Sequence, residues 1–127
     1  MISLLTIFTS FPELIMLKLK ILIVDDEIDY CSIMKNYFEE KNYEVFLATN
    51  LKQAFEQIDE NLPDILFLDN NLPDGRGWSH IDELVKKIPT AKLYLISAYN
   101  HKLTAIPSNN VTIWEKPISV KLLNEHF

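Results

Sequence analysis

Three short apolar runs, each followed at once by a polar residue, constrain the fold of this chain more than any other feature. They are Ile21–Val24 before Asp25, Ile65–Leu68 before Asp69, and Leu93–Ile96 before Ser97. Unbroken apolar runs rich in branched residues are typical of strands that helices cover on both faces of a parallel sheet. Two weaker runs, Glu44–Ala48 and Val111–Trp114, predict edge strands.

Helical patterns lie between these runs. Apolar residues at helical spacing predict helices over residues 27–41, 51–62, 78–88 and 120–127, whereas the pattern over residues 99–110 is weak. Strands that alternate with helices imply right-handed crossovers and a parallel sheet. The chain is therefore predicted to be one five-stranded, doubly wound α/β unit.

Composition narrows the class of protein. A chain of 127 residues suits one domain. Its net charge is −6, from 18 acidic and 12 basic residues, and no lysine or arginine cluster occurs. Binding to nucleic acid needs basic patches, so it is not expected. Cys31 is the only cysteine, which excludes a disulfide framework and favours a reducing, cytoplasmic location.

The chain divides into an apolar N-terminal extension, residues 1–17, and a domain over residues 18–127. Stable membrane insertion or export is the least favoured role, because the stretch lacks a basic start, is interrupted by Pro12 and Glu13, and falls short of the ~20 apolar residues of a spanning helix. Two other interpretations stay open. The extension packs on the domain or on a second copy as a homodimer, or translation starts at Met16, just before the first strand.

Polar residues at the strand ends form the candidate site. Ligands of an open parallel sheet bind beyond the carboxyl ends of its strands, so Asp25, Asp26, Asp69, Ser97 and Lys116 are expected at one edge. Two carboxylates at ~4 Å repel by about 4 kcal/mol at an effective dielectric of ~20. A divalent cation such as Mg²⁺ removes that cost. A carboxylate held this way is a competent nucleophile for phosphoryl transfer, which indicates a phosphoacceptor site at Asp69.

Four segments carry a family resemblance when they are taken in order. They are Ile23-Val24-Asp25-Asp26-Glu27, Leu68-Asp69-Asn70-Asn71-Leu72-Pro73-Asp74-Gly75-Arg76-Gly77, Ser97-Ala98 and Glu115-Lys116-Pro117. Over about residues 19–127 the chain resembles the receiver domain of two-component response regulators. The resemblance implies a flavodoxin-like (CheY-like) fold with strand order 2-1-3-4-5, in which the fourth and fifth helices are shortened here.

The resemblance also implies a role for each matching residue. Asp25 and Asp26 would bind Mg²⁺ together with Asp69, the phosphoacceptor, and the Asn71 backbone carbonyl would complete the metal site. The remaining assignments are the switch hydroxyl at Ser97, the phosphoryl-binding ammonium at Lys116, and a peptide before Pro117 that is often cis. Gly75 and Gly77, the only glycines, lie in the loop after Asp69, which is expected to need backbone freedom.

The expected function is that of a phosphoacceptor that takes its phosphoryl group from a sensor histidine kinase or a histidine phosphotransfer protein. It is not expected to be an enzyme, although a receiver can catalyse its own phosphorylation and dephosphorylation. One alternative is a degenerate receiver that serves as a docking or dimerisation module independently of phosphorylation. Another, an aspartyl phosphohydrolase, usually has a second aspartate where this chain has Asn71.

One position departs from the family pattern. Most receivers have an aromatic residue three positions before the lysine, and its ring swings inward on phosphorylation. Ile113 occupies that position here, and Trp114 follows it. The switch ring is therefore expected to be missing or supplied in another way.

Overall fold

The computed structural model describes residues 17–98 and 109–127. Five strands form a parallel sheet in the order β2-β1-β3-β6-β7, and β4 and β5 form a separate two-stranded hairpin. In chain order the elements are β1 (Lys20–Val24), α3 (Ile28–Glu40), β2 (Glu44–Ala48), α4 (Leu51–Asn61), β3 (Ile65–Asp69), β4 (Asn71–Leu72), β5 (Gly75–Arg76), the 3₁₀ helix η1 (Gly77–His80), α5 (Ile81–Lys87), β6 (Lys92–Ser97), β7 (Val111–Glu115) and α6 (Val120–His126). The predicted strand order 2-1-3-4-5 and the flavodoxin-like architecture are confirmed, with the two weaker runs at the edges.

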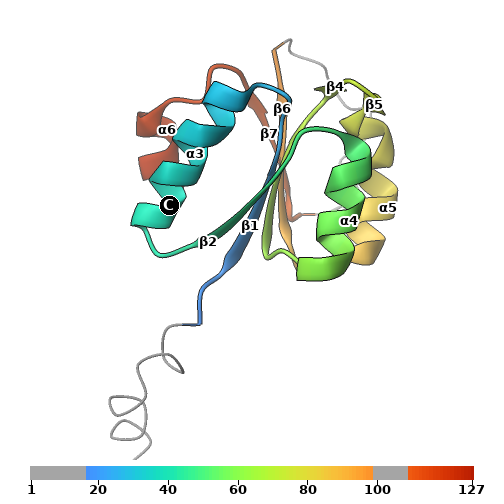
Figure 1. The fold of residues 1–127 in the computed structure, drawn as a ribbon, viewed down its shortest axis with the longest axis horizontal. Coiled ribbons are helices and arrows are strands. Elements are labelled where there is room, and N and C mark those ends of the chain that lie inside the picture. Colours follow the sequence, from blue (N-terminus) through green and yellow to red (C-terminus); the bar gives the residue numbers. More distant parts are fainter. Residues whose placement is uncertain (1–16, 99–108) are drawn as a thin grey trace, which may run out of the picture.

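Helices cover both faces of the sheet. Figure 1 shows α3 and α6 on one face and α4 and α5 on the other. Because successive strand residues point to opposite faces, each buried strand supplies both layers. Leu22 and Val24 of β1 pack in the layer under α4 and α5, whereas Ile21 and Ile23 pack in the layer under α3 and α6. This double burial explains the unbroken apolar runs.

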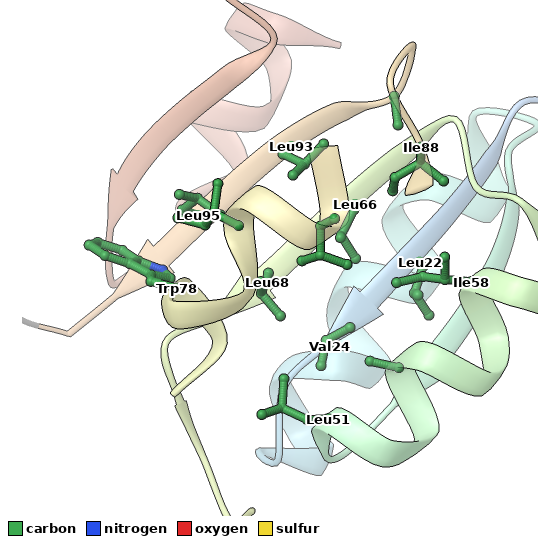
Figure 2. Packing of buried hydrophobic residues seen from close by; sticks show 14 of the residues in the cluster. Leu22, Val24, Leu51, Ile58, Leu66, Leu68, Trp78, Ile88, Leu93 and Leu95 are labelled. Carbon is green, nitrogen blue, oxygen red and sulfur yellow. The ribbon is translucent and has the colours of Figure 1, made fainter. Parts of the chain in front are cut away.

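The two layers differ in composition. Aliphatic side chains dominate the layer under α4 and α5, where Trp78 lies at one end of the cluster (Figure 2). Aromatic rings are concentrated in the layer under α3 and α6. There the ring of Phe67 stacks on that of Tyr94 with centroids 4.8 Å apart, and the ring of Phe127 meets that of Phe38 at 5.0 Å. The half-buried ring of Phe127 thus packs against this layer of the core.

Side chains from two loops form hydrogen bonds with the first turn of α4. The side chain of Asn50 accepts a hydrogen bond from the backbone N–H of Gln53 and caps α4. The carboxylate of Asp74, in the β4–β5 turn, accepts from the backbone N–H groups of Leu51 and Lys52, at 2.8 and 3.0 Å. The hairpin after β3 is therefore fastened to the first turn of α4.

The helix predicted over residues 78–88 begins differently from the expectation. Its first turn is the 3₁₀ helix η1, and α5 follows from Ile81. The cause is local: Asn70 accepts the backbone N–H of Gly77 on its carbonyl and that of Trp78 on its side-chain oxygen. These bonds tie the first turn to the end of β3.

Some predictions fall outside the described residues. The structure of the extension up to Met16, and that of residues 99–108 where a shortened fourth helix was expected, are not described. The last helix, α6, has seven residues. Among residues 17–98 and 109–127, no helix has the length and apolar character needed to cross a bilayer.

Candidate functional site

The carboxyl ends of four neighbouring strands meet at one edge of the sheet. The register pairs Val24 with Leu68, and Asp69 with Ile96. It also pairs the last residue of β6, Ser97, with the last residue of β7. The predicted site residues at the ends of β1, β3, β6 and β7 are therefore brought together.

Three carboxylates gather at this edge. Asp25, Asp26 and Asp69 each offer an oxygen, and these oxygens lie within 4.8 Å of one another. Asp25 and Asp69 are buried, whereas Asp26 is exposed. Hard oxygen ligands at this spacing, open to solvent on one side, suit a cation such as Mg²⁺.

Lys116 supplies the opposite charge. Its ammonium nitrogen lies 2.8 Å from Asp25 Oδ2 and 3.6 Å from Asp69 Oδ1. A third carboxylate oxygen, Glu27 Oε1, lies at 3.2 Å. The backbone N–H of Lys116 donates to the carbonyl of Ser97 at 2.8 Å, which fixes the start of the side chain against β6.

The electrostatic environment perturbs two of these groups. Burial, followed by the charge of Asp25, raises the pKa of Asp69 from 3.8 to about 6, although Lys116 works in the other direction. For Lys116 burial lowers the pKa, but the hydrogen bond and charge of Asp25, with help from Asp69, outweigh it and leave the pKa above its ordinary value. At neutral pH the site thus holds a cationic lysine beside the Asp69 carboxylate, whose negative charge is disfavoured by burial and by Asp25.

A cavity of about 360 Å³ opens above the acidic cluster. Its lining includes the predicted residues Asn71 and Ser97, the latter buried at 5% exposure. The full lining is Asp26, Glu27, Asp69, Asn70, Asn71, Arg76, Ser97, Ala98 and Lys116. A small anion placed here would contact the acidic cluster, the hydroxyl and the ammonium together.

The two glycines shape the loop beside Asp69 for different reasons. Gly75 has a φ of +149°, which side chains rarely tolerate. For Gly77 the reason is close approach: a Cβ atom there would collide with the carbonyl oxygen of Asp69 and the side chain of Leu68. Both glycines are thus required, but only Gly75 for the backbone freedom that was expected.

The last predicted features lie around β7. The Lys116–Pro117 peptide is cis, as expected. Ile113 packs against the layer under α4 and α5, whereas Trp114 packs in the opposite layer, with its ring 4.7 Å from that of Tyr94. Trp114 therefore cannot substitute for a ring at position 113, because it points to the other face of the sheet.

Sequence reasoning missed three residues at the site. Glu27 was treated as the start of a helix, yet its carboxylate contacts Lys116. No role is predicted for Asn70, yet its side-chain oxygen accepts a hydrogen bond from the backbone N–H of Trp78, in the first turn after the hairpin. Arg76 lines the cavity. Of the three, only Glu27 carries a signal in the sequence, because it is an acidic residue that directly follows the Asp25-Asp26 pair.

These residues match a known family. The sequence profile of the response regulator receiver domain matches residues 21–127. The chain belongs to this family. The match to receiver domains begins within β1 and includes every residue assigned to the site, from Asp25 to Lys116.

The chain is similar to receivers in relatives of different length. The transcriptional regulatory protein ZraR of Escherichia coli (strain K12) is 30% identical over 86 residues, which make up 68% of this chain and 20% of ZraR. The chemotaxis protein CheY of Listeria monocytogenes is 36% identical over 81 residues, 63% of this chain and 68% of CheY. The receiver thus matches a small part of the first relative and about two-thirds of the second.

Solved structures share the fold. A two-component response regulator from Clostridium difficile has a TM-score of 0.77 at 29% identity, over 86% of this chain and 92% of that one. A response regulator protein from Burkholderia pseudomallei, solved with a phosphorylated aspartic acid, a calcium ion and citrate, has a TM-score of 0.73 over 84% and 65%. Its identity is 20%, so this second likeness concerns the fold alone.

Proposed function

We propose that this receiver accepts a phosphoryl group on Asp69 from a phosphohistidine, in a reaction that depends on Mg²⁺. One observation carries the proposal: the Lys116 ammonium lies 3.6 Å from the carboxylate of Asp69, inside a cluster of three carboxylates. The Burkholderia pseudomallei structure with a phosphorylated aspartic acid and a calcium ion supports it, because that protein has the same fold.

The chemistry uses few groups. A carboxylate oxygen of Asp69 attacks phosphorus, and an O–P bond forms as the N–P bond to the donor histidine breaks, leaving the electron pair on the histidine nitrogen. Asp25, Asp26, Asp69 and the backbone carbonyl of Asn71 are the groups to hold Mg²⁺, which when bound neutralises charge on the phosphoryl oxygens. No further cofactor enters the proposal.

Two other side chains act after the transfer. The Lys116 ammonium pairs with a phosphoryl oxygen, and the Ser97 hydroxyl donates a hydrogen bond to another. Both groups line the cavity above Asp69. The new contacts would shift the loops after β3 and β6, and this shift would transmit the phosphorylation signal to a partner. The protein would turn over no substrate beyond its own phosphorylation and dephosphorylation.

The partner is a sensor histidine kinase or a histidine phosphotransfer protein, and the proposed location is the cytoplasm. Membership of the receiver family supports the partner, and the single buried cysteine suits a reducing compartment. The net charge of −6 supports signalling through protein contacts rather than nucleic acid.

A second candidate is a receiver that docks its partners without phosphorylation. The observation that favours it is at β7, where Ile113 replaces the usual ring and Trp114 packs on the opposite face. In that case the acidic edge would be retained without being used for transfer, and the contact with the partner would persist when Asp69 cannot be phosphorylated.

A phosphate-affinity gel separates the two candidates. The full chain is incubated with acetyl phosphate and Mg²⁺, with Asp69→Asn and a Mg²⁺-free sample as matched controls. The proposal expects a retarded band that requires both Asp69 and the metal. The absence of that band in the unmodified protein would reject the phosphoacceptor and favour the docking module.

A further inference from the structure

The Lys116 ammonium is surrounded by three carboxylates, and its hydrogen bond goes to Glu27 Oε1 at 3.2 Å. Asp25, Glu27 and Asp69 each place an oxygen between 2.8 and 3.6 Å from the nitrogen. The ring of Tyr30 lies on a further side, with its centroid 5.2 Å from the nitrogen. A phosphoryl oxygen that pairs with Lys116 therefore competes with these partners for the ammonium.

The three partners differ in how easily they are displaced. The side chains of Asp25 and Asp69 are 2% and 6% exposed, whereas that of Glu27 is 64% exposed. A buried carboxylate that loses its cation is left without water, which is costly, but an exposed one is rehydrated at once. The Glu27 contact is thus the one that yields.

The position of Glu27 is fixed by its backbone. Its N–H donates to Asp25 Oδ1 at 2.9 Å, and its carbonyl accepts from Cys31 at 3.0 Å. Glu27 is also the N-cap residue of α3, yet its side chain makes no capping bond within the described residues. The carboxylate reaches across to Lys116 instead.

We propose that Glu27 is a positioning residue that holds Lys116 in the unphosphorylated receiver and competes with the phosphoryl group for it. The inference rests on the proposed function and deepens it. Glu27 sets the balance between the two states, because each phosphorylation event must break the Glu27–Lys116 contact and each dephosphorylation event restores it. Removal of that contact therefore favours the phosphorylated state.

The test uses beryllofluoride as the phosphoryl mimic at saturating Mg²⁺, with binding followed by amide NMR titration of the full chain. Glu27→Gln keeps the length of the side chain and removes its charge. It is expected to tighten beryllofluoride binding about two- to fivefold, the range that an exposed ion pair commonly provides. Asp29→Asn, in the same first turn of α3 but outside the site, is the matched control and should bind as the parent does.

A second variant separates the contact from simple charge repulsion. Glu27→Asp keeps the charge but is one methylene shorter, so it cannot span the 3.2 Å contact in the same geometry. The proposal expects Glu27→Asp to bind beryllofluoride more tightly than the parent, as Glu27→Gln does. Parent-like binding by Glu27→Asp would show that charge alone acts, and would overturn the positioning role.

A titration with Mg²⁺ alone tests whether Glu27→Gln changes the affinity of the site for every ligand. Loss of an acidic neighbour should leave Mg²⁺ binding equal or weaker, while beryllofluoride binding tightens, so the two effects differ in direction. If Glu27→Gln binds beryllofluoride no better than the parent, the inference fails while the proposed function stands. If the parent binds no beryllofluoride at all, both fail.

Discussion

The carboxylate of Asp69 is buried beside Asp25 and Asp26, and Lys116 is the cation nearest to it within the described residues. Its pKa, about 6, means that the free receiver carries this charge at neutral pH at a cost to folding. A group whose pKa is higher in the folded state than in the unfolded chain stabilises the fold only at low pH. That stabilisation is lost as the pH rises through the folded-state pKa.

Asp69→Asn is therefore expected to stabilise the metal-free protein at pH 7.5, by about 1–3 kcal/mol, since each pKa unit corresponds to about 1.4 kcal/mol. The gain should shrink as the pH falls below about 6 and vanish below about 4, where Asp69 is protonated in both states. Urea unfolding across this pH range measures it. Asp29→Asn should show no such gain, and a destabilised Asp69→Asn at pH 7.5 would contradict the electrostatic account.

At the scale of elements, the carboxylate of Asp74 joins the β4–β5 hairpin to α4. Asp74, in the turn between β4 and β5, accepts two backbone N–H groups at the start of α4. The hydrogen bond from Leu51 lowers the pKa of Asp74, with a further contribution from Lys52. A lowered pKa means that this contribution to stability is present at neutral pH and is lost as the pH falls to where Asp74 takes up a proton.

Asp74→Ala should therefore free the hairpin from α4. The two N–H groups of Leu51 and Lys52 would lose their acceptor, so their amide hydrogens should exchange faster and the urea midpoint at pH 7 should fall. Hydrogen-exchange NMR measures both residues directly. Glu56→Ala, an exposed acid on the same helix, is the control. Unchanged exchange at Leu51 and Lys52 would show that the contact contributes nothing.

At the scale of the whole molecule, the aromatic layer links the end of the chain to the centre of the sheet. The ring of Phe127 lies 5.0 Å from that of Phe38, 5.6 Å from that of Tyr94 and 6.0 Å from that of Phe67. These rings belong to α3 and to two central strands. The last residue therefore connects elements that are far apart in sequence.

Phe127→Ala is expected to lower the free energy of unfolding by about 1–3 kcal/mol, less than for a fully buried phenylalanine because Phe127 is half-buried. Chemical denaturation of the two proteins gives the difference. Glu125→Ala removes an exposed side chain from α6, the helix that Phe127 follows, and should change little. A Phe127→Ala protein as stable as its parent would mean that the C-terminal ring is not part of the core in solution.

Much of this architecture could be predicted from the sequence because it depends on local patterns. Apolar runs fix the strands, and parallel strands bring their carboxyl ends to one edge, so Asp25, Asp69 and Lys116 had to meet. The resemblance to receivers then supplied the strand order. The sheet face to which each residue of β7 points also follows from alternation, which is why Ile113 and Trp114 separate.

Other features could not be predicted because they depend on loop geometry. The reach of Glu27 to Lys116 depends on a backbone turn fixed by Asp25. The fastening of α4 by Asp74 joins positions 22 and 23 residues apart, which share no periodic pattern. The 3₁₀ start of the helix after the hairpin follows from hydrogen bonds to Asn70. Contacts of this kind appear only when the loops are placed in three dimensions.

The partition of the core into two layers gives the molecule one indole on each side of the sheet. Trp78 follows the hairpin beside the acidic edge, and Trp114 lies among the rings of the opposite layer. The protein thus contains two intrinsic optical probes with the sheet between them. A change confined to the face under α4 and α5 will alter the emission of Trp78 alone, whereas one that also reaches the opposite face will alter that of Trp114, so single Trp→Phe variants report which faces of the sheet respond.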